Sequence, residues 1–232
     1  MVAILQTEQL SKRFGFKAAL KSVNLAVEPG RIVGLLGPNG SGKTTFLKLC
    51  NGLITPSGGT VTIDGNAPGD KTKAVVSYLP ERTYLNDWMT VGQILTFFGD
   101  FYTDFNREKA ERMLENLNID ARERLKSLSK GTKEKVQLIL VMAREAKLYL
   151  LDEPIGGVDP AARDYILDTI IRSHNPAASI IISTHLIADI ENILDDVIFL
   201  KNGEVALMDS ADNLRAKNNT SIDGLFREVF KC

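Results

Sequence analysis

Alternation of apolar and polar residues marks two stretches near the start of the chain. Residues 1–10 and 20–27 both alternate in this way, and the period of two predicts strands with one exposed face. Later apolar runs are continuous, which is typical of strands buried on both faces of a sheet. We expect such strands at residues 32–36, 74–79, 147–154 and 179–183, a further strand at 60–63, and a terminal hairpin from 197–200, a turn at 201–203 and 204–208.

Apolar residues recur at helical spacing from residue 91 to residue 117, with an interruption at 103–106 where Asp104, Phe105 and Asn106 predict a cap. Ser129 precedes another amphipathic stretch, and Asp159 with Pro160 supplies a capping residue followed by proline at a first helical position. These two signals predict helices at residues 133–146 and 161–171, and we expect two more short amphipathic helices at 212–217 and 222–230. The pattern predicts an α/β protein with a helical insert at 91–146 between two strand-rich portions.

Charge and composition narrow the class of protein. The 232 residues include 28 basic and 29 acidic side chains, a balance that favours neither a nucleic-acid groove nor an anionic membrane surface, so we expect no nucleic-acid partner. Apolar runs such as 136–143 fall far short of the roughly 20 residues that cross a bilayer. Residues 1–9 lack the pattern of a secretory signal. Two cysteines, Cys50 and Cys232, give no disulfide framework or metal cluster, which fits a reducing cytosolic setting.

One stretch carries recognisable chemistry. Residues 37–44, Gly-Pro-Asn-Gly-Ser-Gly-Lys-Thr, fit the phosphate-binding pattern G-x-x-x-x-G-K-[ST], between an apolar strand and a helix as the motif requires. Such a loop turns its backbone N–H groups around a phosphate, and the following helix directs its positive end at the same anion. Lys43 is then a point charge for the β and γ phosphates, and the Thr44 hydroxyl is a ligand for Mg²⁺.

Two carboxylates and a histidine follow buried strands. Asp152 and Glu153 end one strand and His185 follows another, at the edge where open α/β sheets place their ligands. One carboxylate can hold Mg²⁺, the next can position or deprotonate an attacking water, and the histidine can contact a γ-phosphate. Phe14 can stack on a purine ring, although an aromatic residue beside a glycine more often packs or decorates a turn.

The order of these motifs resembles the nucleotide-binding subunit of ATP-binding cassette (ABC) transporters over essentially the whole chain. Residues 37–44 match the Walker A motif, and 147–154 match Walker B with its following glutamate. Residues 157–159 match the D-loop, and His185 stands at the position of the switch histidine. Phe14 falls at the position of the aromatic residue that stacks on adenine.

Two positions depart from the family pattern. Residues 128–132, Leu-Ser-Lys-Gly-Thr, occupy the place of the signature Leu-Ser-Gly-Gly-Gln; Ser129 and Gly131 retain the phosphate-binding geometry before a helix, and Lys130 adds a positive charge. Glu81 stands where the family has the glutamine of its Q-loop. An ionised carboxylate can ligate Mg²⁺ but cannot donate a hydrogen bond to water. Both departures bear on the rate of hydrolysis and on whether two sites of a dimer are equally active.

The resemblance implies a P-loop NTPase (RecA-like) fold, ATP and Mg²⁺ as cofactors, and ATP hydrolysis. It implies Glu153 as general base, Lys43 and His185 as catalytic partners, and Thr44, Glu81 and Asp152 at the metal. The nucleotide contacts implied are those of Phe14, Gly37, Asn39, Gly40, Ser41, Gly42, Lys43, Thr44, Thr45, Ser129, Gly131 and Asp159. The implied single ABC domain divides into a core with an N-terminal antiparallel β-subdomain (1–90 and 147–210), a helical signature subdomain (91–146) and a short helical tail (211–232).

The resemblance also implies partners. In this family the signature of one subunit completes the ATP site of another, which implies a head-to-tail homodimer or a heterodimer with a second ATPase subunit. A separate transmembrane permease is implied, with the chain peripheral on the cytoplasmic face of the membrane and Tyr84 and Trp88 lining the docking groove. The sequences of residues 78–81, 88–90 and the signature 128–131 resemble those of bacterial subunits that export drugs or antimicrobial peptides, so the expected function is to power export of a drug, lipid or antimicrobial or toxin peptide. An importer subunit, a soluble ABC-type ATPase of translation or DNA maintenance, and a regulatory module that holds ATP without hydrolysis stay open as alternatives.

Overall fold

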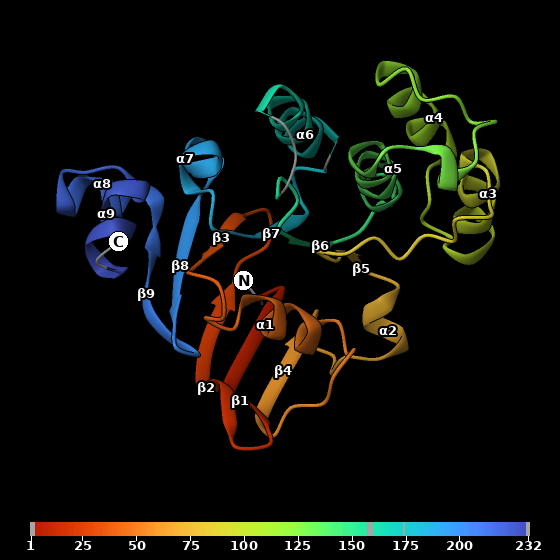
Figure 1. Ribbon diagram of the computed structural model, residues 1–232. Coiled ribbons are helices and arrows are strands. Elements are labelled where there is room, and N and C mark those ends of the chain that lie inside the picture. Colours follow the sequence, from red (N-terminus) through yellow and green to blue (C-terminus); the bar gives the residue numbers. More distant parts are fainter. Residues whose placement is uncertain (1–2, 157–159, 174, 231–232) are drawn as a thin grey trace.

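Two sheets organise the residues that the computed structural model describes, which are 3–156, 160–173 and 175–230 (Figure 1). One sheet is antiparallel with the strand order β2-β1-β4, and the other has the order β5-β6-β7-β3-β8-β9 and is parallel except for the β8–β9 pair. The strands are β1 (Leu5–Phe14), β2 (Lys17–Val27), β3 (Ile32–Leu36), β4 (Gly58–Ile63), β5 (Val76–Leu79), β6 (Leu148–Asp152), β7 (Ser179–Thr184), β8 (Asp196–Lys201) and β9 (Glu204–Ser210).

Helices lie on both faces of the larger sheet and extend beyond its β5 and β9 edges (Figure 1). They are α1 (Lys43–Cys50), α2 (Asp70–Lys73), α3 (Val91–Phe101), α4 (Arg107–Asn116), α5 (Lys130–Met142), α6 (Pro160–Ser173), α7 (Ile187–Ile190), α8 (Ala211–Asn218) and α9 (Ile222–Phe230), with 3₁₀ turns at Leu125–Ser127 and Glu191–Ile193. None of the helices among these described residues combines the length and the apolar character needed to cross a bilayer.

Alternate residues of the parallel strands enter two different cores, because successive side chains of a strand point to opposite faces. On β6, Leu148 and Leu150 pack with α1 and the antiparallel sheet, whereas Tyr149 and Leu151 pack with the helices on the other side. α1 therefore lies between the two sheets, as Figure 1 also shows. This double burial explains why these strands read as unbroken apolar runs.

The parallel register brings three chain segments to one edge of the sheet. Leu36 at the end of β3 pairs with Thr184 at the end of β7, and Asp152 at the end of β6 pairs with Ser183. The loop of residues 37–42, the carboxylates and His185 therefore leave the sheet at the same edge. This is the arrangement that open α/β sheets use for ligand binding.

The sequence patterns predict most elements but misplace several boundaries. The first strand continues to Phe14 and the second begins at Lys17, so the two form one long hairpin, and β5 begins only at Val76 after the unpredicted short helix α2. The helix expected at 133–146 runs from Lys130 to Met142. It begins earlier because the Ser129 hydroxyl caps the backbone N–H of Thr132. The division into core, helical subdomain and tail stays a prediction.

Candidate nucleotide site

The loop of residues 37–42 requires glycine at two positions. Gly42 has a φ of 113°, and a Cβ there would lie 2.6 Å from the carbonyl oxygen of Ala19. A Cβ on Gly37 would lie 2.4 Å from the carbonyl oxygen of Leu200 and 2.6 Å from Oγ of Ser41. The loop thus folds tightly against β2 and β8 before α1 begins at Lys43, which leaves the N–H groups of the first helical turn at the cavity.

Lys43 extends back over this loop. Its Nζ donates hydrogen bonds to the carbonyl oxygens of Gly37 at 2.7 Å and Pro38 at 3.4 Å, and lies 3.8 Å from Oε1 of Glu153. Burial lowers the pKa of the Lys43 ammonium, while the nearby carboxylates of Glu153 and Asp152 oppose that shift. A buried cation held by carbonyl groups is suited to bind an anionic ligand at the loop.

Asp152 is the most deeply buried carboxylate of the site, with 1% of its surface exposed. Its Oδ1 accepts hydrogen bonds from Ser183 Oγ at 2.5 Å and Thr44 Oγ1 at 3.1 Å, whereas Oδ2 is buried without a hydrogen-bond partner among the described residues. Burial raises the pKa of Asp152, and these two hydroxyls oppose the shift. Carboxylate and hydroxyl oxygens are ligands that Mg²⁺ prefers, so the unpaired Oδ2 and the Thr44 hydroxyl fit a Mg²⁺ site.

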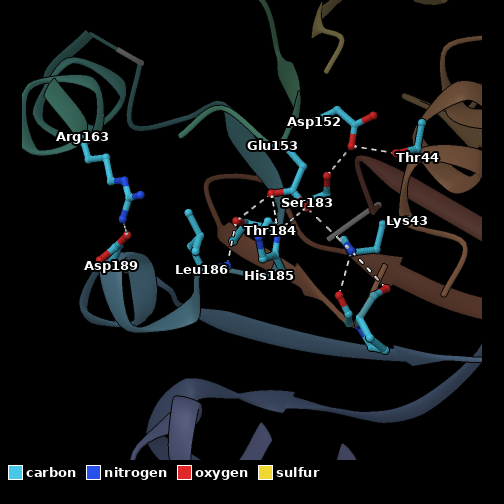
Figure 2. A network of polar contacts seen from close by, with 12 residues as sticks. Lys43, Thr44, Asp152, Glu153, Arg163, Ser183, Thr184, His185, Leu186 and Asp189 are labelled. Carbon is cyan, nitrogen blue, oxygen red and sulfur yellow. Dashed lines mark hydrogen bonds and ion pairs between the residues drawn. The ribbon is translucent and has the colours of Figure 1, made fainter. Parts of the chain in front are cut away.

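Glu153 lies at the centre of a polar network (Figure 2). Its Oε2 accepts a hydrogen bond from Thr184 Oγ1 at 3.0 Å, and Nδ1 of His185 lies 3.1 Å from both carboxylate oxygens. The Glu153 backbone has a φ of 51°, a left-handed conformation that is rare for residues other than glycine. This strain turns the carboxylate from the end of β6 toward Lys43 and His185, and such strain concentrates at functional sites.

Most of the residues predicted to bind nucleotide line one cavity of about 410 Å³. A second hollow of about 260 Å³ adjoins it, because Asn39, Glu81 and Glu153 line both. Lys130, Glu134, Gly156 and His185 complete the second hollow. The larger cavity is lined by Phe14, Lys17, Ala19, Asn39, Gly40, Gly42, Lys43, Thr44, Thr45, Glu81 and Glu153.

Other predicted residues lie outside these cavities. Gly37, Ser41 and Asp152 are not among the described residues that line either cavity, and Oγ of Ser41 is buried without a hydrogen-bond partner among the described residues. Ser129 and Gly131, at the start of α5, are not among the described residues that line either cavity. Asp159 and the rest of the predicted D-loop lie outside the described residues.

Sequence reasoning missed the hydroxyl groups that hold the carboxylates. Ser183 and Thr184 end β7 beside β6, and they bind Asp152 and Glu153 respectively. The sequence pattern of their strand indicates only a buried apolar run. The sequence feature that could have identified both residues is their position just before His185. Lys17 and Ala19, which line the cavity from β2, carried no recognisable signal.

The strand–loop–helix unit with its lysine and the two carboxylates of β6 define a P-loop ATPase. The chain belongs to the ABC transporter family, because the model of that family, described as ABC transporter, matches residues 20–156. It is therefore a nucleotide-binding subunit and an ATP hydrolase of the ABC type.

Two curated relatives and one solved structure illustrate the likeness. The uncharacterized ABC transporter ATP-binding protein YxlF of Bacillus subtilis (strain 168) is 33% identical over 224 residues, which cover 94% of this chain and 75% of that protein. The SkfA peptide export ATP-binding protein SkfE of the same organism is 29% identical over 208 residues and 87% of each chain. A solved structure of an ATP binding subunit of an ABC transporter is 28% identical and superposes with a TM-score of 0.87, over 98% of this chain and 99% of that one.

Proposed function

We propose that this chain hydrolyses ATP to power export of a drug, lipid or antimicrobial peptide through a separate membrane permease. The observation that carries the proposal is the convergence of Lys43, Thr44, Asp152, Glu153 and His185 at one edge of the sheet. Export is supported by similarity to the SkfA peptide export ATP-binding protein. Import is the other candidate direction, and the location proposed is the cytoplasmic face of the membrane.

Each side chain has a separate task in the proposed reaction. Lys43 neutralises charge that develops on the phosphates, and Glu153 accepts the proton of the water that attacks the γ phosphorus as the bridging P–O bond breaks. His185, which holds Glu153 through Nδ1, presents its other ring nitrogen to the γ-phosphate. Thr184 orients the same carboxylate through its hydroxyl.

Mg²⁺ would be held by Thr44 and Asp152. Glu81, which lines the larger cavity, would supply a further oxygen ligand. The ion supplies charge neutralisation on the phosphate oxygens when it is bound. Asp152 is suited to this role because its buried Oδ2 has no hydrogen-bond partner among the described residues. Ser183 fixes the other oxygen and so keeps Oδ2 available.

A second copy of the subunit, or a different ATPase subunit, is proposed to complete the site. Ser129 and Gly131 lie at the capped start of α5, outside the described lining of the chain's own cavities. A head-to-tail pairing would bring them to the phosphates bound by the partner chain. ATP that contacts both chains favours the closed pair, and hydrolysis removes that preference.

The permease is proposed to dock in an aromatic groove of about 620 Å³. Phe97, Phe98 and Phe101 of α3 form one wall, and Tyr84 is among the lining residues, whereas Trp88 is exposed and is not among them. Lys48 and Lys73 add positive charge to the described lining, which includes no carboxylate, whereas Arg144 is already paired with Asp104. A partner segment with an apolar face and a carboxylate fits this chemistry.

The test is a purification from membranes of the source cell in mild detergent with a tagged Glu153→Gln chain. Export coupling predicts that a multi-spanning protein accompanies the tagged chain, and that the cargo is retained in cells that lack the chain. Recovery of ribosomes, DNA or no partner would contradict a transport role. The purified chain should release phosphate from Mg-ATP, and absence of release would favour a regulatory module.

A further inference from the structure

Gln137 carries a buried amide group. It does not line the described cavities of the ATP site, and packing alone does not require an amide at this position. It lies on α5 with 3% of its surface exposed, and its Nε2 donates one hydrogen bond, of 3.2 Å, to the carbonyl oxygen of Pro80. Its Oε1 is buried without a hydrogen-bond partner among the described residues. A buried acceptor without a partner destabilises the fold, whereas an apolar side chain of similar shape does not. The hydrogen bond to Pro80 is therefore the feature of glutamine that an apolar side chain would not supply at this position.

The hydrogen bond from the Gln137 side chain to Pro80 reaches the loop that carries Glu81. Pro80 follows β5, and its carbonyl belongs to the peptide unit that leads into Glu81. Because that unit is planar, holding the carbonyl of Pro80 also fixes the direction in which the chain enters Glu81. Glu81 lines both the nucleotide cavity and the hollow beside Glu153 and His185.

α5 connects this bond to the signature residues. Ser129 caps the start of the helix, and Gln137 follows about two turns later on the side that faces β5. Glu134, three residues before Gln137, lines the hollow with Glu81 and also has a buried oxygen, Oε2, without a partner among the described residues. A second bond, from Ser77 Oγ to the carbonyl of Val141, ties α5 to β5 but does not reach the loop.

We propose that Gln137 is a positioning residue that holds Glu81 at the metal side of the ATP site and links that position to α5. The inference rests on the proposed function, since it assigns Glu81 to the bound cation. The link makes the signature end of α5 and the carboxylate of Glu81 move together. An acceptor left open at Oε1 allows the amide to shift with the loop without breaking a second bond.

The experiment uses the full chain with Gln137→Leu, which keeps the volume and removes the donor. We expect kcat to fall about tenfold and the Mg²⁺ concentration for half-maximal activity to rise about tenfold, as is typical when a group that orients a metal ligand is lost. ATP binding in EDTA should stay unchanged, and the melting temperature should change little, because removal of the unpaired Oε1 offsets loss of the hydrogen bond to the Pro80 carbonyl. Ser77→Ala is the matched control, because it removes the other α5–β5 bond and should leave kcat and the Mg²⁺ dependence unchanged.

A double-mutant cycle with Glu81→Ala separates positioning from packing. If Gln137 acts through Glu81, Gln137→Leu will change neither kcat nor the Mg²⁺ dependence further in the Glu81→Ala background. This inference alone is overturned if Gln137→Leu lowers kcat equally in both backgrounds, or if a lowered melting temperature accompanies that loss. It is also overturned if the wild type is active and Gln137→Leu has the same kcat and Mg²⁺ dependence. A wild-type chain that does not hydrolyse Mg-ATP overturns the proposed function, and this inference with it.

Discussion

The hydroxyl of Ser183 donates a 2.5 Å hydrogen bond to Oδ1 of Asp152 across the neighbouring parallel strands β7 and β6. Thr44 binds the same oxygen, so both hydroxyls stabilise one side of the carboxylate. The other side, Oδ2, is buried without a hydrogen-bond partner among the described residues. In the absence of a cation the folded chain therefore keeps an incompletely compensated negative charge, and this is why burial raises the pKa of Asp152.

Asp152→Asn should stabilise the metal-free chain and abolish Mg²⁺-dependent hydrolysis. Asparagine keeps an acceptor for Ser183 and removes the buried charge. The pKa of Asp152 is higher in the folded state than in the unfolded state, where it is about 3.9. The wild type therefore loses stability as the pH rises from the unfolded-state pKa through the folded-state pKa. The stability gain of the variant should therefore grow with pH over that window. Urea unfolding in EDTA at several pH values measures it.

Metal addition provides the control for this prediction. Mg²⁺ with ATP should raise the midpoint of unfolding of the wild type more than that of Asp152→Asn, because only the wild type offers a carboxylate to the ion. A variant that is less stable than the wild type at pH 8 in EDTA would show that the carboxylate is already well compensated in the folded chain.

Phe14→Ala should weaken ATP binding about tenfold, whereas Phe14→Trp should retain it, because stacking of a base on an aromatic ring contributes about 1–3 kcal/mol. Phe14 lines the cavity at the end of β1 and is half-exposed. Phe16, two residues later and fully exposed, is not among the residues lining the cavity, so Phe16→Ala is the matched control. Titration with a fluorescent ATP analogue distinguishes the variants, and equal affinities for all of them would exclude stacking on Phe14.

The phosphate loop, the carboxylates of β6 and His185 were predictable because each combines a distinctive residue pattern with a strand end. The parallel order of the strands then had to bring them together, and the register of β3, β6 and β7 does so. Ser183 and Gln137 were not predictable, since a serine ending an apolar run and a glutamine within a helix carry no signal of their own. Their roles depend on contacts 31 and 57 residues away in the chain.

Arg144→Met should destabilise the chain by roughly 3 kcal/mol, the cost typical of breaking a buried ion pair. The guanidinium of Arg144 binds Asp104 through two nitrogens, lies 4.0 Å from the ring centroid of Tyr102 and donates to the carbonyl of Val76. It thereby joins β5 to the segment between α3 and α4. Arg107→Met, which removes an exposed ion pair with Glu111, should change stability by less than about 0.5 kcal/mol.

Asp104→Asn combined with Arg144→Met should cost less than the sum of the two single changes, because the double variant leaves no uncompensated carboxylate. Denaturant unfolding of the four chains measures this difference. Strictly additive losses would mean that Arg144 stabilises the chain through the backbone carbonyls and Tyr102 rather than through Asp104.

If the proposed permease docks in the aromatic groove, Tyr84→Ala and Phe101→Ala should reduce its co-purification without changing ATP affinity, because both side chains line that groove. Trp88→Ala is the control, since Trp88 is exposed and is not among the described lining residues. Lys73→Glu should also weaken the complex if the partner segment carries a carboxylate, whereas Lys71→Glu, outside the lining, should not. Equal recovery of the permease with all of these variants would place its docking site elsewhere.

Glu153→Gln should lower ATP hydrolysis by about 10² to 10⁴-fold, the usual contribution of a general base, while ATP binding is retained. The amide has the shape of the carboxylate and keeps an acceptor for Thr184, but it cannot take a proton from water. Bound ATP should therefore persist and hold two chains together, so light scattering of the variant with Mg-ATP should report a dimer that the wild type forms only transiently. Hydrolysis within about tenfold of the wild type would remove Glu153 from the role of general base. A variant that binds Mg-ATP and stays monomeric would instead point to pairing with a different ATPase subunit.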